Sequence, residues 1–583
     1  MSELNPIASS HLNGKTPPLR FGVMSSGTTF QHWQADALTG LHEHGHRLIV
    51  MIVDGRTVQK TSLIHRILKK KWSTFLYMFL EKRVFKPAAK KLVSLSTDFP
   101  DVTTLTCIVE QKGFSEYFQD TDIETIKKFQ LDFILRFGFS IIRGNILSAA
   151  RFGVWSFHHD DEMIYRGGPP GFWEIFRGDP VNGAMMQRLT DKLDGGVILK
   201  KGYLKTIMHS YRENLNQLLS VTSSWPALVA DELSGNMLEI QDVVDQPDVI
   251  ASKTDAPLYK IPGNGEMLKF LYLLLRNRIR FYYRDFIAAE LWNVGIIGKP
   301  IHEVALGTDI IREAEVTWLA PVPGSRYLAD PSGFMIDDKL HILAEDYSYS
   351  SQKAGISEII VEFYPVRVTN PAKVINADRH LSYPYVLQHN GEIYCLPESH
   401  KSCNITLYRR DFGTGKFTQE RVMLEAVEAV DPTLVFFNGL WWLFFTDRKY
   451  SNTHLFLYHA HELTGEFKPH RLNPIKIDIR SARPAGTPFI HKNVLYRPAQ
   501  DCAGTYGGRI AINRVFQLTP EVYIEKIVKF IEPVQGSRYS HGLHTLCSVG
   551  NFTLIDGKTH NLDRHFFRHQ LWKRLKKKGS EDV

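Results

Sequence analysis

Residues 156–199 decide the fold of the first half, and they read SFHHDDEMIYRGGPPGFWEIFRGDPVNGAMMQRLTDKLDGGVIL. The stretch places His158 directly after the apolar run 154–157, which is typical of a buried strand. It places Asp194 in a Leu-Asp-Gly-Gly turn near its end. A histidine and an aspartate on separate loops, joined by a Gly- and Pro-rich segment, are typical of a small acyl-transfer site.

The residues before this stretch alternate apolar strands with helices. Residues 20–24 and 131–138 are predicted strands, and a helix separates the first of them from a further strand at 46–54. This succession predicts an α/β domain with a doubly wound parallel sheet over residues 19–235. Residues 1–18 are predicted to form a disordered tail.

From about residue 318 the chain changes to short strands separated by Gly, Asn and Asp. A loose repeat of about 50 residues has an opening motif such as Asp330-Pro331 or Asp431-Pro432, a strand, a turn and a second strand. Five such units predict an all-β five-bladed propeller over residues 315–560. A β-sandwich is the alternative, but it does not explain the recurring Asp-Pro and Tyr-Pro openings.

The remaining segments are predicted to be a helical junction, 236–314, and a basic C-terminal tail, 561–583. The junction contains an apolar and basic helix at 270–284. A position packed between two domains is the favoured interpretation, and a position on a bilayer surface is the alternative. The tail is expected to be solvated, with contact to an anionic membrane as the alternative.

The overall composition is that of an ordinary globular protein. The net charge of +8 over 583 residues is compatible with an anionic ligand or membrane surface and does not indicate nucleic acid. The five cysteines contain no CxxC pair, so we expect no zinc site and no disulfide framework. We expect no other metal site either. Without a signal-peptide pattern, the expected location is cytoplasmic, with the inner face of the membrane as an alternative.

Residues 131–199 resemble the formyltransferase family that uses 10-formyltetrahydrofolate. The resemblance rests on His158, on the run Tyr165-Arg166-Gly167-Gly168-Pro169 and on the run Leu193-Asp194-Gly195-Gly196. It implies a formyltransferase-like fold over 19–235 and 10-formyltetrahydrofolate as the formyl donor. It also implies an amine acceptor, for which we expect an amino sugar or a nucleotide-linked amino sugar.

The same resemblance implies that His158 and Asp194 are catalytic. A protonated imidazole can donate to the oxygen on which negative charge develops, and a carboxylate can hold the imidazole charged. The family's asparagine falls on Ser156, whose rotatable hydroxyl is less pre-organised, and loss of one such donor costs about 10²–10³ in rate. His159 and Asp160 are neighbouring substitutes, as is Asp161.

Further binding residues follow from this resemblance. A loop that holds the pterin through backbone groups in the family matches Phe137, Gly138, Phe139 and Ile141, with core packing as the competing explanation. Substrate contacts are expected from Arg166 and Gly167.

The second half resembles the propeller of glycoside hydrolase family 43 and, more closely, the propeller-type domain of glucosamine inositolphosphorylceramide transferases. The motifs are HLSYPYV at 380–386, CLPES at 395–399 and YRPAQDC at 496–502. The resemblance implies carbohydrate binding by acids that point into a central pocket, where paired carboxylates would act as general acid and base. The candidates are Asp330, Glu398, Asp431 and Asp501, with Arg497, Arg509 and His544 as groups for an anionic glycan. The Asp-Pro pairs are turn devices in the alternative interpretation.

Three functions are compatible with the sequence. We expect a formyl group to be transferred from 10-formyltetrahydrofolate to an amino sugar in surface-glycan biosynthesis, while the propeller binds the glycan. The alternative is a glycan-processing or glycan-transferring propeller enzyme with a degenerate formyltransferase domain. The third is a binding protein at the membrane surface without catalytic activity.

Overall fold

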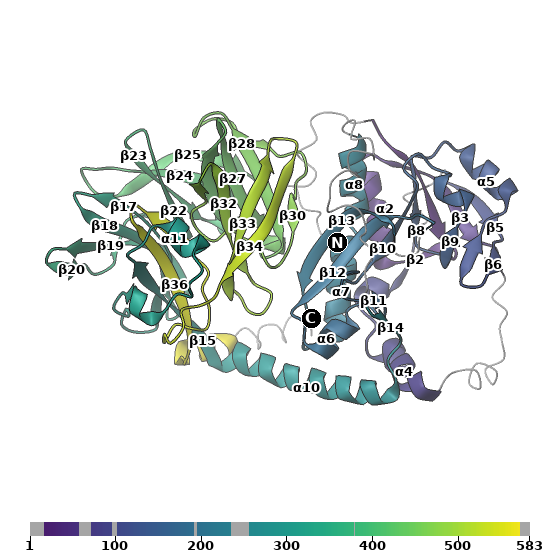
Figure 1. Ribbon diagram of the computed structural model, residues 1–583, viewed down its shortest axis with the longest axis horizontal. Helices are drawn as coiled ribbons and strands as arrows, with labels where there is room; N and C mark the ends of the chain where they lie inside the picture. The colour runs from purple at the N-terminus through teal and green to yellow at the C-terminus, as the bar shows by residue number, and fades with distance from the viewer. Residues whose placement is uncertain are drawn as a thin grey trace, which may run out of the picture. The chain divides into compact units, whose positions relative to one another are not determined.

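The computed structural model describes residues 17–56, 72–95, 99, 102–191, 195–234, 256–377 and 379–571. The chain divides into two compact units, an N-terminal unit (Leu12–Arg278) and a C-terminal unit (Ile279–Val583) (Figure 1). Asp194 and residues 572–583 of the predicted basic tail lie outside the described residues. Among the described helices, none is both long enough and apolar enough to cross a membrane.

The N-terminal unit is built on a seven-stranded sheet in the order β13-β12-β10-β8-β1-β3-β5 (Figure 1). The strands from β10 to β5 are parallel, whereas β12 and β13 run antiparallel at one edge. This confirms the predicted N-terminal parallel sheet. The chain first adds strands on one side of β1 and then on the other, so β1 and β8 flank a topological switch point. The strands are β1 Arg20–Ser25, β3 Arg47–Asp54, β5 Thr103–Cys107, β8 Phe133–Arg136, β10 Val154–His158, β12 Val181–Arg188 and β13 Val197–Lys205.

Apolar side chains cover both faces of this sheet, because successive strand residues point to opposite sides. On one face Ile134 belongs to a buried cluster with Ile126 of α5. On the other face Phe21, Phe133 and Trp155 form a buried aromatic ladder, with ring centroids 5.3 Å and 3.8 Å apart and planes within 6°. The helices of the unit are α2 His32–Glu43, α4 Phe75–Arg83, α5 Asp120–Lys127, α6 Phe172–Arg177, α7 Tyr211–Thr222 and α8 Trp225–Ser234. The short strands are β2 Thr29–Gln31, β4 Leu92–Ser94, β6 Glu110–Lys112, β7 Ser115–Tyr117, β9 Ile141–Arg143, β11 Arg166–Gly167 and β14 Leu258–Tyr259.

The C-terminal unit consists of five antiparallel sheets that follow one another along the chain. One contains β15 Ala288–Ile297, β16 Val316–Trp318, β35 Leu546–Val549 and β36 Phe552–Leu562. The next contains β17 Arg326–Ile336, β18 Lys339–Ser348, β19 Lys353–Phe363, β20 Val366–Val368 and β21 Ala372–Lys373. It is followed by β22 Ser382–His389, β23 Glu392–Glu398, β24 Asn404–Arg410 and β25 Phe417–Glu425. Then come β26 Ala429–Phe437, β27 Leu440–Asp447, β28 His454–Ala460, β29 Lys468–Pro469 and β30 Lys476–Ile477. The last contains β31 Phe489–His491, β32 Val494–Asp501, β33 Arg509–Leu518 and β34 Tyr523–Ile531.

A buried hydrophobic cluster lies between each of these sheets and the next. Four clusters join consecutive sheets from the β15 sheet to the β31 sheet. A fifth joins the last sheet back to the first, because Phe489 and Ile512 share it with Ile297 and Ile555. The pairing of β15 with β36 also brings the two ends of the unit into one sheet. The packing therefore runs in a closed circle, which is the arrangement of a propeller-like fold.

The recurring X-Pro motif of the sequence repeat is a bulge in the first strand of a sheet. Pairing skips two residues at Asp330-Pro331, Tyr383-Pro384 and Asp431-Pro432. The residue before each proline has a positive φ, 51°, 44° and 51° respectively. Proline disfavours helical backbone in the preceding residue, so this left-handed conformation is strained. The motif is thus a bulge within a strand, where the alternative interpretation had placed a turn.

The predicted helical junction differs from the structure. Residues 264–287 form the long helix α10 (Asn264–Ile287), which is followed by β15 and by the short helix α11 (Ile301–Leu306). β15 pairs with β36 along its whole length, so the all-β region begins at Ala288 and not at 315. A short strand-forming run between helical patterns carries little signal of its own, since its partner lies more than 250 residues further along the chain.

Candidate functional sites

The first candidate site is the edge of the N-terminal sheet where three parallel strands end. Met24, Arg136 and Ser156 are aligned in register on β1, β8 and β10. The residues that follow them, including Gly138 and His158, therefore lie at one edge beside the switch point. Ligands in open α/β sheets bind in this position.

Ser156 is buried, and its hydroxyl oxygen accepts two hydrogen bonds from the guanidinium of Arg136. The Nη2–Oγ distance is 2.7 Å and the Nε–Oγ distance is 3.2 Å. Burial lowers the pKa of Arg136, against the opposing charge of Glu116. Glu116 is tied to the same edge because it accepts from Arg56 Nη1 at 2.7 Å and from the Ser140 backbone N–H at 2.6 Å. The serine in the predicted oxyanion-donor position is thus held by a partly buried arginine, Arg136, that sequence reasoning missed.

The backbone of the loop matched to the pterin-binding region is largely engaged inside the unit. The N–H groups of Phe137 and Gly138 both donate to Met24 O at 2.8 Å. Arg136 Nη1 donates to the carbonyl of Phe139 at 3.2 Å. Ile141 begins β9, which pairs with β7. These contacts engage several backbone groups of the loop within the unit, and the contact of Phe137, Gly138, Phe139 and Ile141 with a pterin stays a prediction.

The two histidines at the end of β10 differ in their surroundings. His158 is partly buried and is the last residue of the strand. His159 lies flat against Phe157, with centroids 5.7 Å apart, and its Nε2 is 3.0 Å from Thr222 Oγ1. Burial, together with the charges of His158 and Lys90, lowers the pKa of His159 to about 3. His159 is therefore neutral and serves as part of an aromatic layer with Trp33.

Two further residues predicted at this site, Arg166 and Gly167, form β11. They pair in parallel with β14. A Cβ on Gly167 would lie 2.2 Å from the Tyr259 carbonyl oxygen, so the close approach of the two strands requires glycine there. Arg166 Nη1 lies 3.5 Å from the Ala256 carbonyl. Arg166 and Gly167 therefore form part of a two-stranded parallel sheet.

The second candidate site is an acidic cluster inside the C-terminal unit, at the X-Pro bulges in the first strands of the sheets. Asp330 and Glu345 come from adjacent strands of one sheet, and each carboxyl group raises the cost of ionising the other. Both are buried, with 6% and 8% of their surface exposed. Burial raises the pKa of Glu345 well above its usual range, and the charges of Asp330, Glu398 and Asp431 add to this. Burial raises the pKa of Asp330 as well, against the charge of His544. Two buried carboxyl groups that repel each other's charge favour a state with one protonated and one ionised group.

His544 stands between two carboxylates of the cluster. Its Nδ1 is 2.5 Å from Asp556 Oδ2, and its Nε2 is 3.4 Å from Asp330 Oδ1. Burial alone would lower the pKa of His544, but the charges of Asp556 and Asp330 raise it above its usual value. One atom from each of the three residues lies within 4.8 Å of the others, which is close enough for a metal ion. With both ring nitrogens directed at carboxylates, however, the geometry fits a charged imidazolium bridge better.

Asp431 occupies the equivalent bulge two sheets further along the chain. Its carboxylate accepts from Arg483 Nε at 2.5 Å and from Gln500 Nε2 at 2.8 Å. Its backbone N–H donates to Glu398 Oε2 at 3.2 Å, as the Asp330 N–H does to an Asp556 oxygen at 3.1 Å. Burial raises the pKa of Asp431 to about 8 against the pull of Arg483, and Glu398 raises it further. The two bulges therefore present carboxyl groups to the same cluster in the same way.

Two of the predicted glycan-binding residues, Asp501 and Arg497, have partners outside the acidic cluster. Asp501 pairs with Arg509, whose Nε is 2.8 Å from its Oδ2. Arg497 is almost fully buried and forms an ion pair with Glu525, with Nη2–Oε1 at 2.5 Å and Nε–Oε2 at 3.0 Å. Its other donors reach the carbonyls of Ser481 and Ala482. The structure thus uses the donors of Arg497 inside the C-terminal unit, and its contact with a glycan stays a prediction.

Sequence reasoning missed Glu345, Arg483 and Asp556. Glu345 pairs with the residue before the X-Pro bulge of its repeat, just as Glu398 does in the following one, so an alignment of the repeats could have found it. Asp556 ends the run FTLID at 552–556 in the last repeat, so the same alignment could have found it. Arg483 lies outside the repeated motif, and no local signal distinguishes it.

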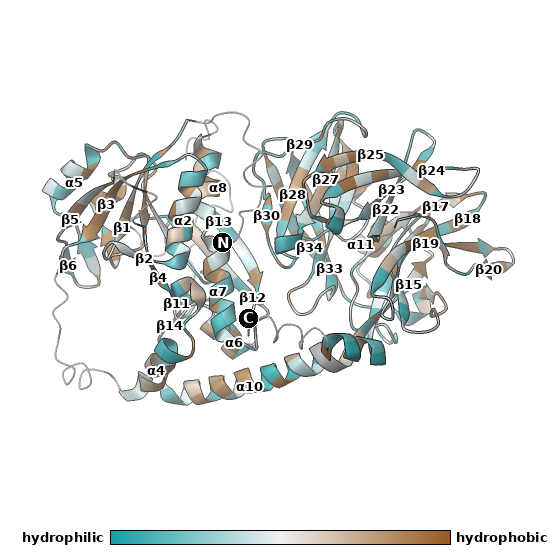
Figure 2. Cartoon of the chain, turned by 180° about the vertical axis from the view of Figure 1, so that it is seen from behind, coloured by the Kyte–Doolittle hydropathy of each residue, from teal (hydrophilic) through white to brown (hydrophobic). Residues whose placement is uncertain are grey.

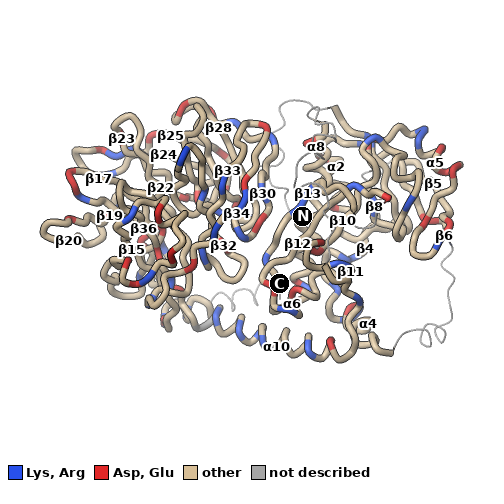
Figure 3. Tube along the Cα trace, viewed as in Figure 1, with Lys and Arg blue, Asp and Glu red and all other residues tan. Residues whose placement is uncertain are grey.

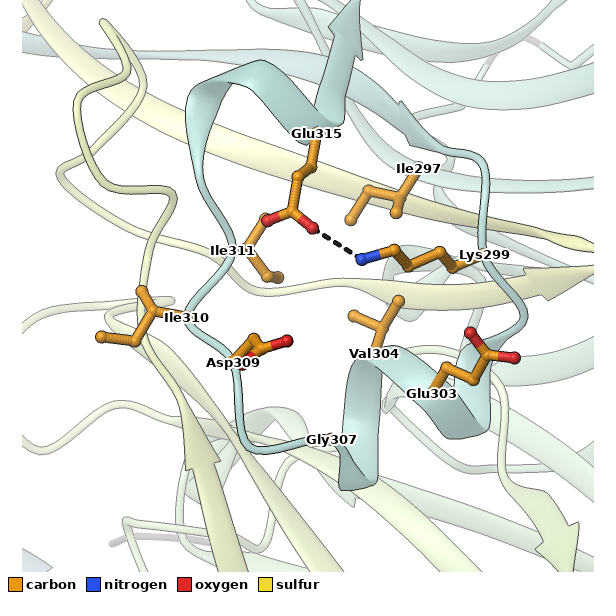
Figure 4. A pocket seen from close by; sticks show the side chains of 9 residues that line it. All are labelled: Ile297, Lys299, Glu303, Val304, Gly307, Asp309, Ile310, Ile311 and Glu315. Atoms are coloured by element: carbon orange, nitrogen blue, oxygen red, sulfur yellow. Dashed lines mark hydrogen bonds and ion pairs between the residues drawn. The ribbon is translucent and has the colours of Figure 1, made fainter.

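A small hollow of the C-terminal unit lies away from these carboxyl groups, between the end of β15, α11 and residues 307–315 (Figure 4). Lys299 and Glu315 point toward each other across it, with 2.6 Å between Nζ and Oε1. Its volume of about 130 Å³ is well below the roughly 300–1,000 Å³ of ligand pockets. We assign no binding role to it.

Comparison with known proteins concerns mainly the C-terminal unit. Residues 311–545 match the family described as glucosamine inositolphosphorylceramide transferase 1, N-terminal. A glucosamine inositolphosphorylceramide transferase 1 from Oryza sativa subsp. japonica is 32% identical over 262 residues, which cover 42% of this chain and 35% of the relative. The chain thus spans about a third of the length of the curated relatives it matches. These matches confirm the resemblance stated for the second half.

Likenesses among solved structures are weaker. An α-L-arabinofuranosidase from Podospora anserina aligns with 46% of this chain and 97% of its own, at 10% identity and a TM-score of 0.32. A glycinamide ribonucleotide transformylase 1 from Symbiobacterium toebii aligns with 37% of this chain and 88% of its own, at 16% identity and a TM-score of 0.24.

Proposed function

We propose that the chain is a glycan-transferring or glycan-processing enzyme whose C-terminal unit binds a carbohydrate at the acidic cluster. The observation that carries this proposal is the convergence of Asp330, Glu345, Glu398 and Asp431 from three different sheets around His544 and Arg483. The relatives named glucosamine inositolphosphorylceramide transferase 1 support the class of enzyme and a sugar-related substrate. This proposal corresponds to the alternative function stated from the sequence.

The chemistry of the cluster suits a sugar. A carboxylic acid beside a carboxylate supplies a proton donor and a proton acceptor at neutral pH, which is what cleavage or formation of a glycosidic bond requires. Glu345 is the proton donor in this scheme and Asp330 the acceptor, because burial raises the pKa of both carboxyl groups but the neighbouring His544 lowers that of Asp330. Arg483 and Gln500 hold Asp431 in place, so that its carboxyl can orient sugar hydroxyls.

The test uses the full chain with a panel of nitrophenyl glycosides of common hexoses, pentoses and N-acetylhexosamines, with and without a sugar acceptor. We expect release of nitrophenol from at least one member. Glu345→Gln and Asp330→Asn should each lower the rate by about 10²–10⁴, the usual contribution of general acid–base catalysis. Asp338→Asn, at an exposed position of the same sheet, is the matched control. The proposal fails if the unmodified chain neither binds nor cleaves any glycoside of the panel, and if Glu345→Gln and Asp330→Asn bind each free sugar as the unmodified chain does.

Formyl transfer from 10-formyltetrahydrofolate to an amino sugar is a second candidate function, and one observation supports it. His158 follows Ser156 at the edge where β1, β8 and β10 end in register, beside the switch point. The full chain would be incubated with 10-formyltetrahydrofolate and a nucleotide-linked amino sugar, and release of tetrahydrofolate would be followed. Turnover that disappears in His158→Ala supports this candidate, and absence of turnover in the unmodified chain removes it.

A further inference from the structure

Aromatic and aliphatic side chains are exposed on α4, on the short 3-10 turn Trp72–Thr74 that precedes it and on the first half of α10. Trp72 is 78% exposed, Leu268 65% and Tyr272 64%. The complete set, which we call the aromatic face, is Trp72, Phe75, Phe79, Leu268, Tyr272 and Leu275. Exposed apolar groups gathered in this way mark an interaction surface.

The two helices are fastened together at their N-terminal ends. The Asn264 side chain accepts from the Leu76 N–H at 3.0 Å and donates to the Trp72 carbonyl at 2.8 Å. One asparagine thus connects the first turn of α10 to the first turn of α4. The two segments that carry the aromatic face are therefore joined to each other within the N-terminal unit.

The spacing along α10 shows that these residues form a stripe separate from the buried one. Leu268, Tyr272 and Leu275 are four and three residues apart, so they lie on one side of the helix. Met267 and Phe270 are fully buried against the unit and make up another side. Apolar and polar bands alternate along α10 in Figure 2. The helix therefore buries one apolar stripe and exposes a second.

Basic residues accompany the exposed stripe. Arg276 lies one turn after Tyr272, and Lys82 and Arg83 lie one turn after Phe79, so each is a neighbour of an exposed ring. All three are exposed. Lys and Arg recur along α10 in Figure 3. The nearby acids are engaged locally: Glu81 pairs with Lys90 at 3.6 Å, while Glu266 accepts from the Gly263 N–H at 2.7 Å.

We propose that the aromatic face binds the surface of a bilayer that contains anionic phospholipid. The apolar rings would enter the boundary between headgroups and acyl chains, where Trp and Tyr are favoured. Arg276, Lys82 and Arg83 would contact lipid phosphates and carboxylates. A hollow of about 890 Å³ between α4 and residues 259–263, lined in part by Tyr77, Met78 and Ile261, adds apolar surface next to the face. Charge complementarity is what selects this partner over an uncharged surface.

This inference does not depend on the acidic cluster of the C-terminal unit, so either proposal can fail alone. The test is flotation of the full chain with vesicles of phosphatidylcholine alone and of phosphatidylcholine with phosphatidylserine, at low and high salt. We expect binding only to the vesicles with phosphatidylserine, and weaker binding at high salt. Arg83→Gln and Arg276→Gln should each lower the association constant about fivefold.

A second variant tests the apolar contribution. Tyr272→Ser combined with Leu275→Ser should lower vesicle binding by at least about tenfold, since each side chain loses its burial in the bilayer. The matched controls are Phe114→Ser, at an exposed position of the same unit, and Lys128→Gln. Circular dichroism melting should show the variants folded as the unmodified chain is.

Two results would overturn the proposal. One is equal binding with and without phosphatidylserine, or vesicle binding that neither set of variants changes. The other is a doubled mass in sedimentation equilibrium that Tyr272→Ser with Leu275→Ser restores to the monomer value, without any vesicle binding. That outcome would assign the face to a contact between two copies of the chain.

Discussion

The two units bring polar side chains to their candidate sites by different backbone devices. In the N-terminal unit Arg136 and Ser156 lie at register-aligned ends of parallel strands, so topology alone brings them together. In the C-terminal unit Asp330 and Asp431 lie within strands, where strained bulges with positive φ reorient them. The aligned strand positions of the N-terminal unit require close backbone packing. The strained bulges of the C-terminal unit require a dense network of charged side chains that stabilises them. The two sites should therefore fail under different kinds of substitution.

The largest effect is expected where a buried charge in the C-terminal unit loses its partner. Arg497→Met would leave Glu525 without its bidentate contact, although Lys476 Nζ stays 2.8 Å away. Breaking a buried ion pair costs about 3–5 kcal/mol, so the unfolding free energy of this unit should fall by about that amount. Denaturant unfolding followed by tryptophan fluorescence would measure it.

Arg514→Met is the control for this prediction, because Arg514 is exposed on the neighbouring strand β33. We expect its effect to stay within about 0.5 kcal/mol, as for most surface substitutions. A loss below about 1 kcal/mol in Arg497→Met would mean that this buried ion pair does not stabilise the propeller-like unit, and the expected sensitivity of that unit to a lost charge partner would be wrong.

Close backbone packing is the corresponding weak point of the N-terminal unit. A Cβ on Gly138 would lie 2.5 Å from the Ser25 carbonyl carbon and 2.7 Å from the Ser26 nitrogen, both of which are main-chain atoms. Gly138→Ala would therefore separate the ends of β1 and β8. A loss of about 1–3 kcal/mol is expected from such overpacking, measured as the unfolding free energy of the N-terminal unit. Unchanged stability would show that the switch point can open without cost.

The architecture of both units could be predicted because each follows from a pattern of neighbouring residues in the sequence. Apolar runs separated by helices indicated the parallel sheet, and repeated X-Pro openings indicated successive β-sheets. The X-Pro motif also located Asp330 and Asp431, since the bulge that directs them is a property of the motif itself. The repeat therefore carried information about the site as well as the fold.

Partners drawn from distant segments could not be predicted in the same way. Arg483 contacts Asp431 from 52 positions away, and Asp556 contacts the Asp330 N–H across 226 positions. Arg136 was visible as part of a strand, but only the register of β8 and β10 brings it to Ser156. Local sequence patterns specify on which face of a strand or helix a side chain lies. Which charged side chains pair with each other depends on how the strands and sheets pack.

A pH-dependent effect should distinguish the aromatic layer of the N-terminal unit from its charged edge. The folded state keeps His159 neutral, with a pKa of about 3, whereas the unfolded state binds a proton below the ordinary histidine pKa of 6.5. Stability from this group is therefore present above pH 6.5 and is lost as the pH falls toward 3. The loss should be about 1.4 kcal/mol per pH unit within this window.

The measurement compares the unmodified chain with His159→Leu from pH 7 to pH 5 in denaturant unfolding. The variant lacks the titrating ring, so the difference in unfolding free energy between the two should shift in favour of the variant as the pH falls. Buried acids such as Asp160, whose pKa burial raises to about 8, titrate in both proteins and cancel in the difference. A difference independent of pH would place the ring in contact with water and would remove His159 from the buried layer.

The smallest effect concerns a second glycine of the N-terminal unit and separates the local clash at Gly138 from any general sensitivity of this unit. Gly40 lies inside α2, has an ordinary helical backbone, and an added Cβ would meet no atom within 4 Å. Gly40→Ala should therefore stabilise the unit by about 0.5–1 kcal/mol, because alanine reduces the entropy of the unfolded chain and favours the helix. Opposite signs for the two glycine substitutions, read from the same unfolding transition, would assign the cost at Gly138 to the contact with β1. Two losses of similar size would instead mean that any added methyl group perturbs this unit, and the switch point would no longer be its special feature.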